Sequence, residues 1–100
     1  MRVISLGPLK AFWTRHPDAE SALRLWYGTT RRASWRSLQD VRRTYPHADA
    51  VRDASGDVLT VFNVGGNKYR LIVRIRYDYG LVNVRCVLTH GEYDRGTWKE

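Results

Sequence analysis

The sequence predicts an α+β fold, in which helices pack on one face of a small and mainly antiparallel sheet. Apolar residues recur at helical spacing through the first half of the chain, whereas Val, Ile, Leu, Tyr and Phe crowd into three strand-like runs in the second half. Because the helices precede the strands instead of alternating with them, an α/β arrangement is disfavoured. One hundred residues, 43% of them hydrophobic, predict a single domain over residues 1–100 with one modest core.

The first half of the chain is expected to hold a short strand and three helices. Residues 3–4 predict an edge strand, and the helix that follows ends before Pro17, because the residue preceding a proline disfavours helical backbone. Asp18 is expected to cap the second helix, whose apolar residues form one stripe. Ser37 is expected to cap the third helix, with Asp40 three residues later as part of a capping box.

The second half predicts an antiparallel meander of three strands, over residues 58–64, 68–77 and 81–88. The pairs Gly65-Gly66 and Tyr79-Gly80 separate these runs at the length of hairpin turns.

Two-residue turns would set a register in which Phe62 lies opposite Tyr69 and Val73 lies opposite Cys86. One face of the sheet is then apolar and lies under the helices. Cys86 is expected there as a small buried hydrophobic residue and not as a nucleophile. The residues expected on this face are Tyr69, Leu71, Val73, Ile75, Val84, Cys86 and Leu88.

The opposite face of the middle strand is expected to be basic. The chain has 17 Lys and Arg against 10 Asp and Glu, a net charge of +7, and all but three of the basic residues are Arg. The row Lys68, Arg70, Ile72, Arg74 and Arg76 has four cations and no carboxylate. An ordinary solvated face would mix charges, because like charges side by side repel. The pattern favours an anionic partner, above all nucleic acid, and predicts that Arg70 points away from the core as a surface residue.

Residues 89–94 follow the last strand and bring an imidazole, carboxylates and a phenol beside this basic face. His90, Glu92, Tyr93 and Asp94 include groups that could cleave RNA by attack of its own 2′-hydroxyl. The same segment also fits a structural turn, in which His90 caps the strand and the carboxylates balance nearby arginines. The residues alone leave both interpretations open. The other two histidines are weaker candidates, because one lies on an apolar helix face and the other in a turn: they are His16 and His47.

The composition excludes several other classes. One cysteine rules out a disulfide framework within the chain, and the three histidines lack metal-ligand spacing, so no metal and no cofactor is expected. No apolar run approaches the roughly 18–20 residues of a membrane span, and the first residues lack the apolar segment of a secretory signal. A cytoplasmic setting without a membrane partner is therefore expected.

Two blocks of the sequence carry a resemblance to a known family. Residues 62–70 read Phe-Asn-Val-Gly-Gly-Asn-Lys-Tyr-Arg, and residues 89–94 read Thr-His-Gly-Glu-Tyr-Asp. With these blocks the chain resembles the HigB toxins, which are RelE-like, ribosome-dependent mRNA interferases of bacterial type II toxin–antitoxin systems. Shorter matching stretches lie at residues 1–5, 12–13, 16–20, 26–27 and 44–46.

The resemblance implies a RelE-like fold, cleavage of mRNA in the ribosomal A site, and neutralisation by a HigA-like helix-turn-helix antitoxin. It implies that Lys68 and Arg70 stabilise the phosphate and the transition state, with His90 and Tyr93 as acid/base candidates. A non-catalytic basic domain that binds RNA or the ribosome and blocks translation is the alternative function. Residues expected to contact RNA are Asn63, Asn67, Arg74, Arg76, Arg85 and Glu92.

Overall fold

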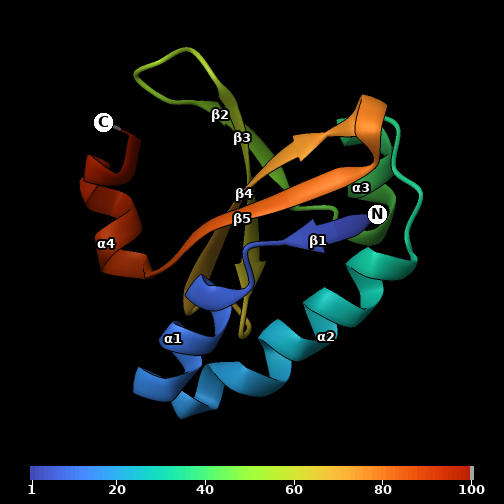
Figure 1. Ribbon diagram of the computed structural model, residues 1–100. Helices are drawn as coiled ribbons and strands as arrows, with labels where there is room; N and C mark the ends of the chain where they lie inside the picture. Colours follow the sequence, from blue (N-terminus) through green and yellow to red (C-terminus); the bar gives the residue numbers. More distant parts are fainter. Residues whose placement is uncertain (100) are drawn as a thin grey trace.

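A five-stranded sheet with the order β1-β5-β4-β3-β2 organises the protein (Figure 1). The computed structural model describes residues 1–99. Neighbouring strands are antiparallel except β1, which pairs with β5 in parallel at the edge of the sheet. The α+β prediction is confirmed. The strands are β1 (Arg2–Ile4), β2 (Asp49–Arg52), β3 (Val58–Val64), β4 (Tyr69–Arg76) and β5 (Leu81–Thr89), and the helices are α1 (Gly7–Arg15), α2 (Glu20–Arg32), α3 (Leu38–Thr44) and α4 (His90–Arg95).

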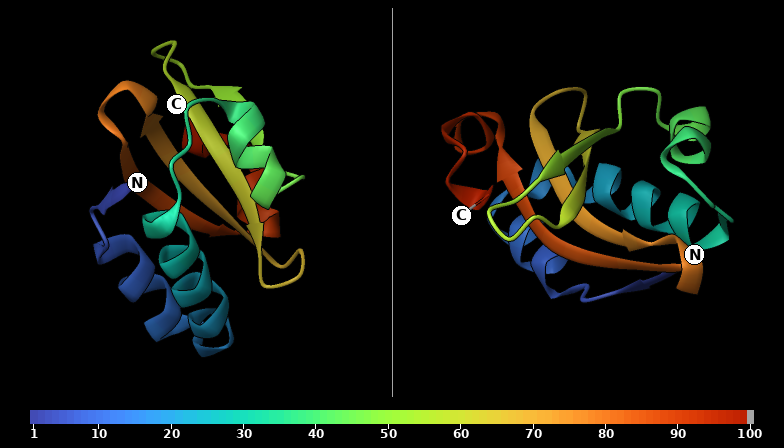
Figure 2. Two further views of the ribbon diagram at one scale, coloured as in Figure 1. Left: turned by 90° about the vertical axis from the view of Figure 1, so that its right-hand side faces the viewer. Right: turned by 90° about the horizontal axis from the view of Figure 1, so that it is seen from above.

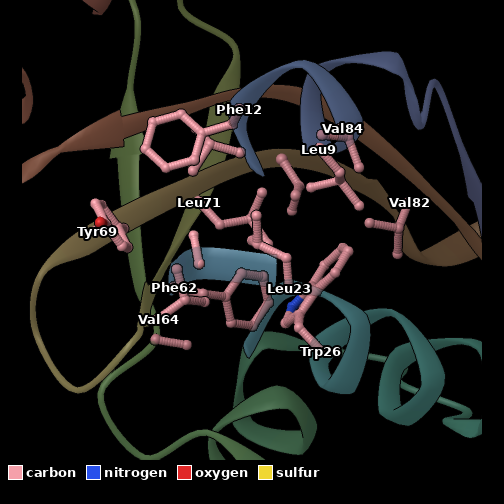
Figure 3. Packing of buried hydrophobic residues seen from close by; sticks show 14 of the residues in the cluster. Leu9, Phe12, Leu23, Trp26, Phe62, Val64, Tyr69, Leu71, Val82 and Val84 are labelled. Atoms are coloured by element: carbon pink, nitrogen blue, oxygen red, sulfur yellow. The ribbon is translucent and has the colours of Figure 1, made fainter. Parts of the chain in front are cut away.

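Helices α1, α2 and α3 cover one face of the sheet and α4 packs on the other (Figure 2). Under the first three helices, Leu23 and Trp26 of α2 pack with Phe62 and Leu71 of the sheet, and all four side chains are at most 1% exposed (Figure 3). Against α4 a smaller cluster forms around Leu59, Val61 and Ile72. The sheet therefore has an apolar cluster on each face, and the cluster under α4 is much the smaller of the two.

The start of α2 differs from the prediction that Asp18 caps it. A single 3₁₀ turn, Pro17–Ala19, precedes the helix, and no side chain caps it. The Asp18 carboxylate instead accepts hydrogen bonds from the Tyr69 hydroxyl (2.8 Å) and the Lys68 ammonium (3.0 Å). The carboxylate binds these distant partners instead of the amides at the start of α2, because they offer it a hydroxyl and a full positive charge. The Ser37 cap is confirmed, since its hydroxyl accepts a bond from the Asp40 amide at 3.4 Å. The capping box is not completed, because the Asp40 carboxylate accepts a bond from the amide of Arg36 (2.9 Å) and not from that of Ser37.

Two elements were absent from the predicted meander. Strand β2 is a short edge strand with mostly exposed residues, so it lacks the apolar alternation that marks a half-buried strand. Helix α4 has only six residues, and a full capping box defines its start. The Thr89 hydroxyl accepts a bond from the Glu92 amide, while the Glu92 carboxylate accepts one from the Thr89 amide.

The register between β3 and β4 differs from the prediction by two residues. Phe62 lies opposite Leu71, not Tyr69, because the turn has four residues, 65–68. Gly65 and Gly66 adopt φ angles of +63° and +70°, which glycine reaches without the steric cost of a side chain. A shift of two residues leaves every side chain on its predicted face.

A β-bulge between β4 and β5 has a larger effect. Val73 pairs with Val84 but Ile72 pairs with Cys86, which leaves Arg85 as the extra residue on β5. Because side chains alternate along a strand, this one insertion turns Cys86 and its neighbour Leu88 off the core face. The expectation of a core position for both was wrong. Cys86 is half-buried in the cluster under α4, and burial raises the pKa of its thiol.

Candidate nucleic-acid interface

The predicted cationic row does not lie on an open, uniformly basic face. The small apolar cluster under α4 occupies the centre of this face, with Leu59, Val61 and Ile72 at its heart. Cations surround this cluster instead of running straight across the sheet. The remaining members of the cluster are Val51, Cys86, Leu88, Tyr93 and Trp98.

Most of the predicted cations have carboxylate partners, although none of these partners is in the strand row. The turn between β2 and β3 and the short 3₁₀ turn Tyr77–Tyr79 fold over the strand ends and supply them. The argument that the row lacks neutralising acids was therefore wrong, because periodicity shows neighbours on one strand and not loops that fold back. The pairs are Arg74 with Asp57 (3.8 Å), Arg76 with Asp78 (3.7 Å) and Arg85 with Asp53 (4.0 Å).

Lys68 belongs to the β3–β4 turn and not to the strand row. Its ammonium lies 3.0 Å from the Asp18 carboxylate, on the side of the turn that faces the helices. The Tyr69 hydroxyl, and after it the Lys68 ammonium, lower the pKa of Asp18, and the same carboxylate raises the pKa of Lys68. The lysine is thus a positioned and fully charged group beside the turn.

Arg70 is the one buried cation of the predicted set, with 8% of its surface exposed. Its guanidinium donates to the backbone carbonyls of Asn67 (3.0 Å) and Tyr69 (3.2 Å) and lies 5.5 Å from the centre of the Tyr93 ring. The expectation of a surface residue was wrong, because α4 closes over this end of β4. A buried guanidinium held by two carbonyls has a fixed orientation.

Helix α4 brings His90 and Tyr93 to the same end of the sheet. The amide of His90 donates to the Lys68 carbonyl (3.1 Å), which places the start of α4 against the β3–β4 turn. The His90 imidazole is exposed, with Nδ1 3.7 Å from a carboxylate oxygen of Asp94. The Tyr93 ring stacks on Trp98, and burial raises the pKa of its hydroxyl.

Two asparagines border an open hollow of about 470 Å³ beside this cluster. Asn63 lies opposite Arg70 on the neighbouring strand, and the Asn67 carbonyl holds the Arg70 guanidinium. His47 lines the same hollow together with Gly66, although it was a weak candidate from sequence. Sequence reasoning overlooked His47 because it did not predict strand β2. This strand pairs Asp49 with Val61, and the same register continued by two residues places His47 opposite Asn63.

The predicted residues therefore separate into two groups. One group gathers around the β3–β4 turn and the start of α4: Lys68, Arg70, His90, Tyr93, Asn63 and Asn67. Arg74, Arg76 and Arg85 lie farther along the strands, and six residues of β4 put Arg76 roughly 20 Å from Arg70. Glu92 has a structural role in the cap of α4, and the Thr89 amide lowers the pKa of its carboxylate.

The first group can perform general acid/base chemistry on a phosphate. It combines a fixed guanidinium, an exposed imidazole and a phenol that stays protonated at neutral pH. Among residues 1–99, no three His, Cys, Asp or Glu side chains gather as a metal-binding cluster. In the same part of the chain, no helix has the length and apolar composition to cross a membrane.

Comparison with known proteins identifies the family of the chain. The family model for HigB toxins, described as the RelE-like toxic component of a toxin–antitoxin system, matches residues 19–96. The chain is 27% identical over 94 residues to the mRNA interferase toxin HigB of Escherichia coli K12, covering 94% of this chain and 88% of the relative. It is 26% identical over 97 residues to an mRNA interferase HigB of Escherichia coli O6:H1 strain CFT073, covering 97% and 92%. Since the family model spans most of the chain, the protein belongs to the HigB family of RelE-like toxins.

Proposed function

We propose that this toxin is an endoribonuclease that cleaves mRNA on the ribosome without a metal ion, by attack of the 2′-hydroxyl on the adjacent phosphate. Relatives over nearly the whole chain are named mRNA interferases. The observation that carries the proposal is the gathering of Arg70, His90 and Tyr93 at one end of the sheet.

In the proposed mechanism His90 takes the proton of the 2′-hydroxyl, since imidazole exchanges protons readily near neutral pH. The 2′-oxygen then bonds to phosphorus, and the bond from phosphorus to the 5′-oxygen breaks. Arg70 stabilises the negative charge that develops on the phosphoryl oxygens, and the Tyr93 phenol donates its proton to the leaving 5′-oxygen. The products are a 2′,3′-cyclic phosphate and a 5′-hydroxyl.

Lys68 is the proposed second contact to the scissile phosphate, and its ammonium, which lies 3.0 Å from the Asp18 carboxylate, would exchange that partner for the phosphate. Tyr93 carries the proton that this step needs, since the ordinary pKa of a phenol is already well above 7 and burial raises the pKa of Tyr93 further. Asn63 and Asn67 are the proposed contacts to the nucleotides beside the cleaved bond, since both border the hollow next to Arg70.

Dependence on the ribosome is supported by the charge balance of the sheet face under α4. Arg74, Arg76 and Arg85 already have carboxylate partners, so they attract a free RNA strand less than unpaired arginines would. These arginines remain proposed RNA contacts, which exchange their carboxylates for phosphates once the strand is held by the ribosome. The proposal includes a cytoplasmic setting and a HigA-like helix-turn-helix antitoxin.

The test is cleavage of mRNA on purified ribosomes programmed with a defined message, with analysis of the product ends. We expect discrete cuts in the A site that end in a 2′,3′-cyclic phosphate and a 5′-hydroxyl. Products with a 3′-hydroxyl and a 5′-phosphate would contradict the mechanism. Arrest of translation without any cut would instead support the alternative, a non-catalytic domain that blocks the ribosome.

A further inference from the structure

A second basic site lies at the end of the sheet opposite α4. There the chain start and β1 meet the segment after α2, and in Figure 1 the N-terminus and α4 lie at opposite ends of the sheet. The segments enclose an open hollow of about 450 Å³. Arg2, Arg31 and Arg36 line it together with Trp35 and Gly80.

These three arginines differ from Arg74 and Arg76 of the predicted row in having no acidic partner. All three are exposed, and within residues 1–99 no carboxylate lies at ion-pair distance from any of their guanidinium groups. Three cations around one hollow repel one another unless an anion joins them. The hollow is therefore a stronger candidate for binding a polyanion than the paired arginines of the sheet face.

Tertiary contacts hold the backbone near Arg2 and Arg36, and Arg31 belongs to helix α2. Trp35, beside Arg36, is 5% exposed and stacks on Phe62 with ring centroids 6.2 Å apart. The backbone amide of Arg2 donates to the Gly80 carbonyl at 2.7 Å, which fixes the start of β1 against the β4–β5 connection. The backbone positions of the arginines are thus set before any ligand arrives, and this lowers the entropic cost of binding.

An aromatic side chain next to the hollow points to RNA as the anion. Tyr79 precedes the lining residue Gly80, and 71% of its surface is exposed. The Arg76 guanidinium lies 4.7 Å from the centre of the Tyr79 ring. Arg76 covers one face of the ring, so the exposed ring can offer its other face to a base, while the arginines of the hollow offer paired hydrogen bonds to phosphates; an acidic peptide would use only the charges.

We propose that Arg2, Arg31 and Arg36 bind the phosphodiester backbone of an RNA segment other than the strand being cleaved, with Tyr79 as a stacking platform. The length of β4 separates this end of the sheet from Arg70 by roughly 20 Å, beyond the nucleotides that flank the scissile bond. The inference rests on the proposed function, because a toxin working on the ribosome meets RNA on several sides. The shared chemistry is an RNA backbone, supplied by ribosomal RNA or by a distant stretch of mRNA.

The test compares Arg2→Ala/Arg31→Ala/Arg36→Ala with the control Lys10→Ala/Arg24→Ala/Arg43→Ala, which removes the same charge elsewhere. Three probes are used over a series of salt concentrations: vacant ribosomes, an unstructured 30-nucleotide RNA and a six-nucleotide RNA with a 2′-deoxy scissile position. The first variant should bind vacant ribosomes or the 30-nucleotide RNA at least about tenfold more weakly, since three charge-assisted contacts are lost. Its salt slope should be smaller in magnitude by about 2, at roughly 0.7 per phosphate. Binding of the six-nucleotide RNA should weaken less than that of the larger probe, because the end of the sheet with Lys68 and Arg70 still holds it.

The weakened probe identifies the source of the RNA. Unchanged binding of both large probes would overturn the proposal, as would an equal loss in the control or an equal loss for the six-nucleotide RNA. An acidic peptide serves as a fourth probe, and loss of its binding with RNA binding intact would overturn the proposal in favour of a protein partner. If the triple variant melts at a lower temperature, Arg31→Glu/Arg36→Glu repeats the test. A wild-type protein that binds as expected but cuts no ribosome-bound mRNA would refute the proposed function while leaving this site standing.

Discussion

Replacing Arg70 with alanine should damage both stability and activity, and the two losses can be separated. The guanidinium donates to two backbone carbonyls and lies over the Tyr93 ring while 8% exposed. Hydrogen bonds from charged groups contribute about 1.5–3 kcal/mol when buried, and an arginine over a tyrosine ring contributes about 0.5–1 kcal/mol. Removing the guanidinium also removes the cost of keeping a positive charge away from water, and this offsets part of the lost stability. We expect Arg70→Ala to lower the free energy of unfolding by about 1–3 kcal/mol.

For a domain of this size, each kcal/mol corresponds to roughly 4–8 °C in Tm, so thermal melting resolves the effect. Cleavage on programmed ribosomes should fall by about 10²–10³-fold at a temperature where the variant stays folded, because a donor to developing phosphoryl charge is lost. Arg70→Lys should recover only part of either loss, because an ammonium cannot donate in the same planar fork.

Arg85→Ala is the matched control, since Arg85 is exposed and pairs with Asp53 only at 4.0 Å. It should change stability by less than about 0.5 kcal/mol. An Arg70→Ala protein that melts like wild type would refute the structural account of this residue. One that is folded and cuts at the wild-type rate would refute its catalytic role.

Three further predictions follow from the same geometry. Tyr93→Phe keeps the stack on Trp98 but removes the proton donor, so cleavage should fall about 10²-fold or more while Tm changes little; a wild-type rate in the cleavage assay would refute the acid role. Asp18→Asn should make stability less sensitive to acid. The pKa of Asp18 in the folded protein is lowered from its ordinary value of 3.8. The carboxylate therefore stabilises the fold fully above pH 3.8, and this stabilisation is lost as the pH falls through the lowered pKa of the folded state. Melting at pH 7 and pH 3 tests this, and an equal drop in Tm for both proteins would contradict it. In the Arg2→Ala/Arg31→Ala/Arg36→Ala variant, short single-stranded RNA should bind with a salt slope near −1.4, as roughly two phosphates meet Lys68 and Arg70; a slope of −3 would mean that the paired arginines Arg74, Arg76 and Arg85 already bind free RNA.

Local patterns in the sequence determined the fold class and most of the elements. The helices before Pro17 and after Ser37 follow from a proline and a cap, and both signals act on the adjacent backbone. The three long strands follow from runs of apolar residues that only a buried sheet can accommodate. The blocks at residues 62–70 and 89–94 also indicated the family and one end of the candidate site.

Only the tertiary structure decided which side chains meet. One β-bulge moved Cys86 off the core face, because a single extra residue reverses the alternation of a strand. Loops that return to the strand ends placed Asp57 and Asp53 beside arginines that the strand pattern left unpaired. Helix α4 buried Arg70, which the same pattern assigned to the surface. Each of these outcomes depends on contacts between segments far apart in the chain, and periodicity reports only the neighbours along one element.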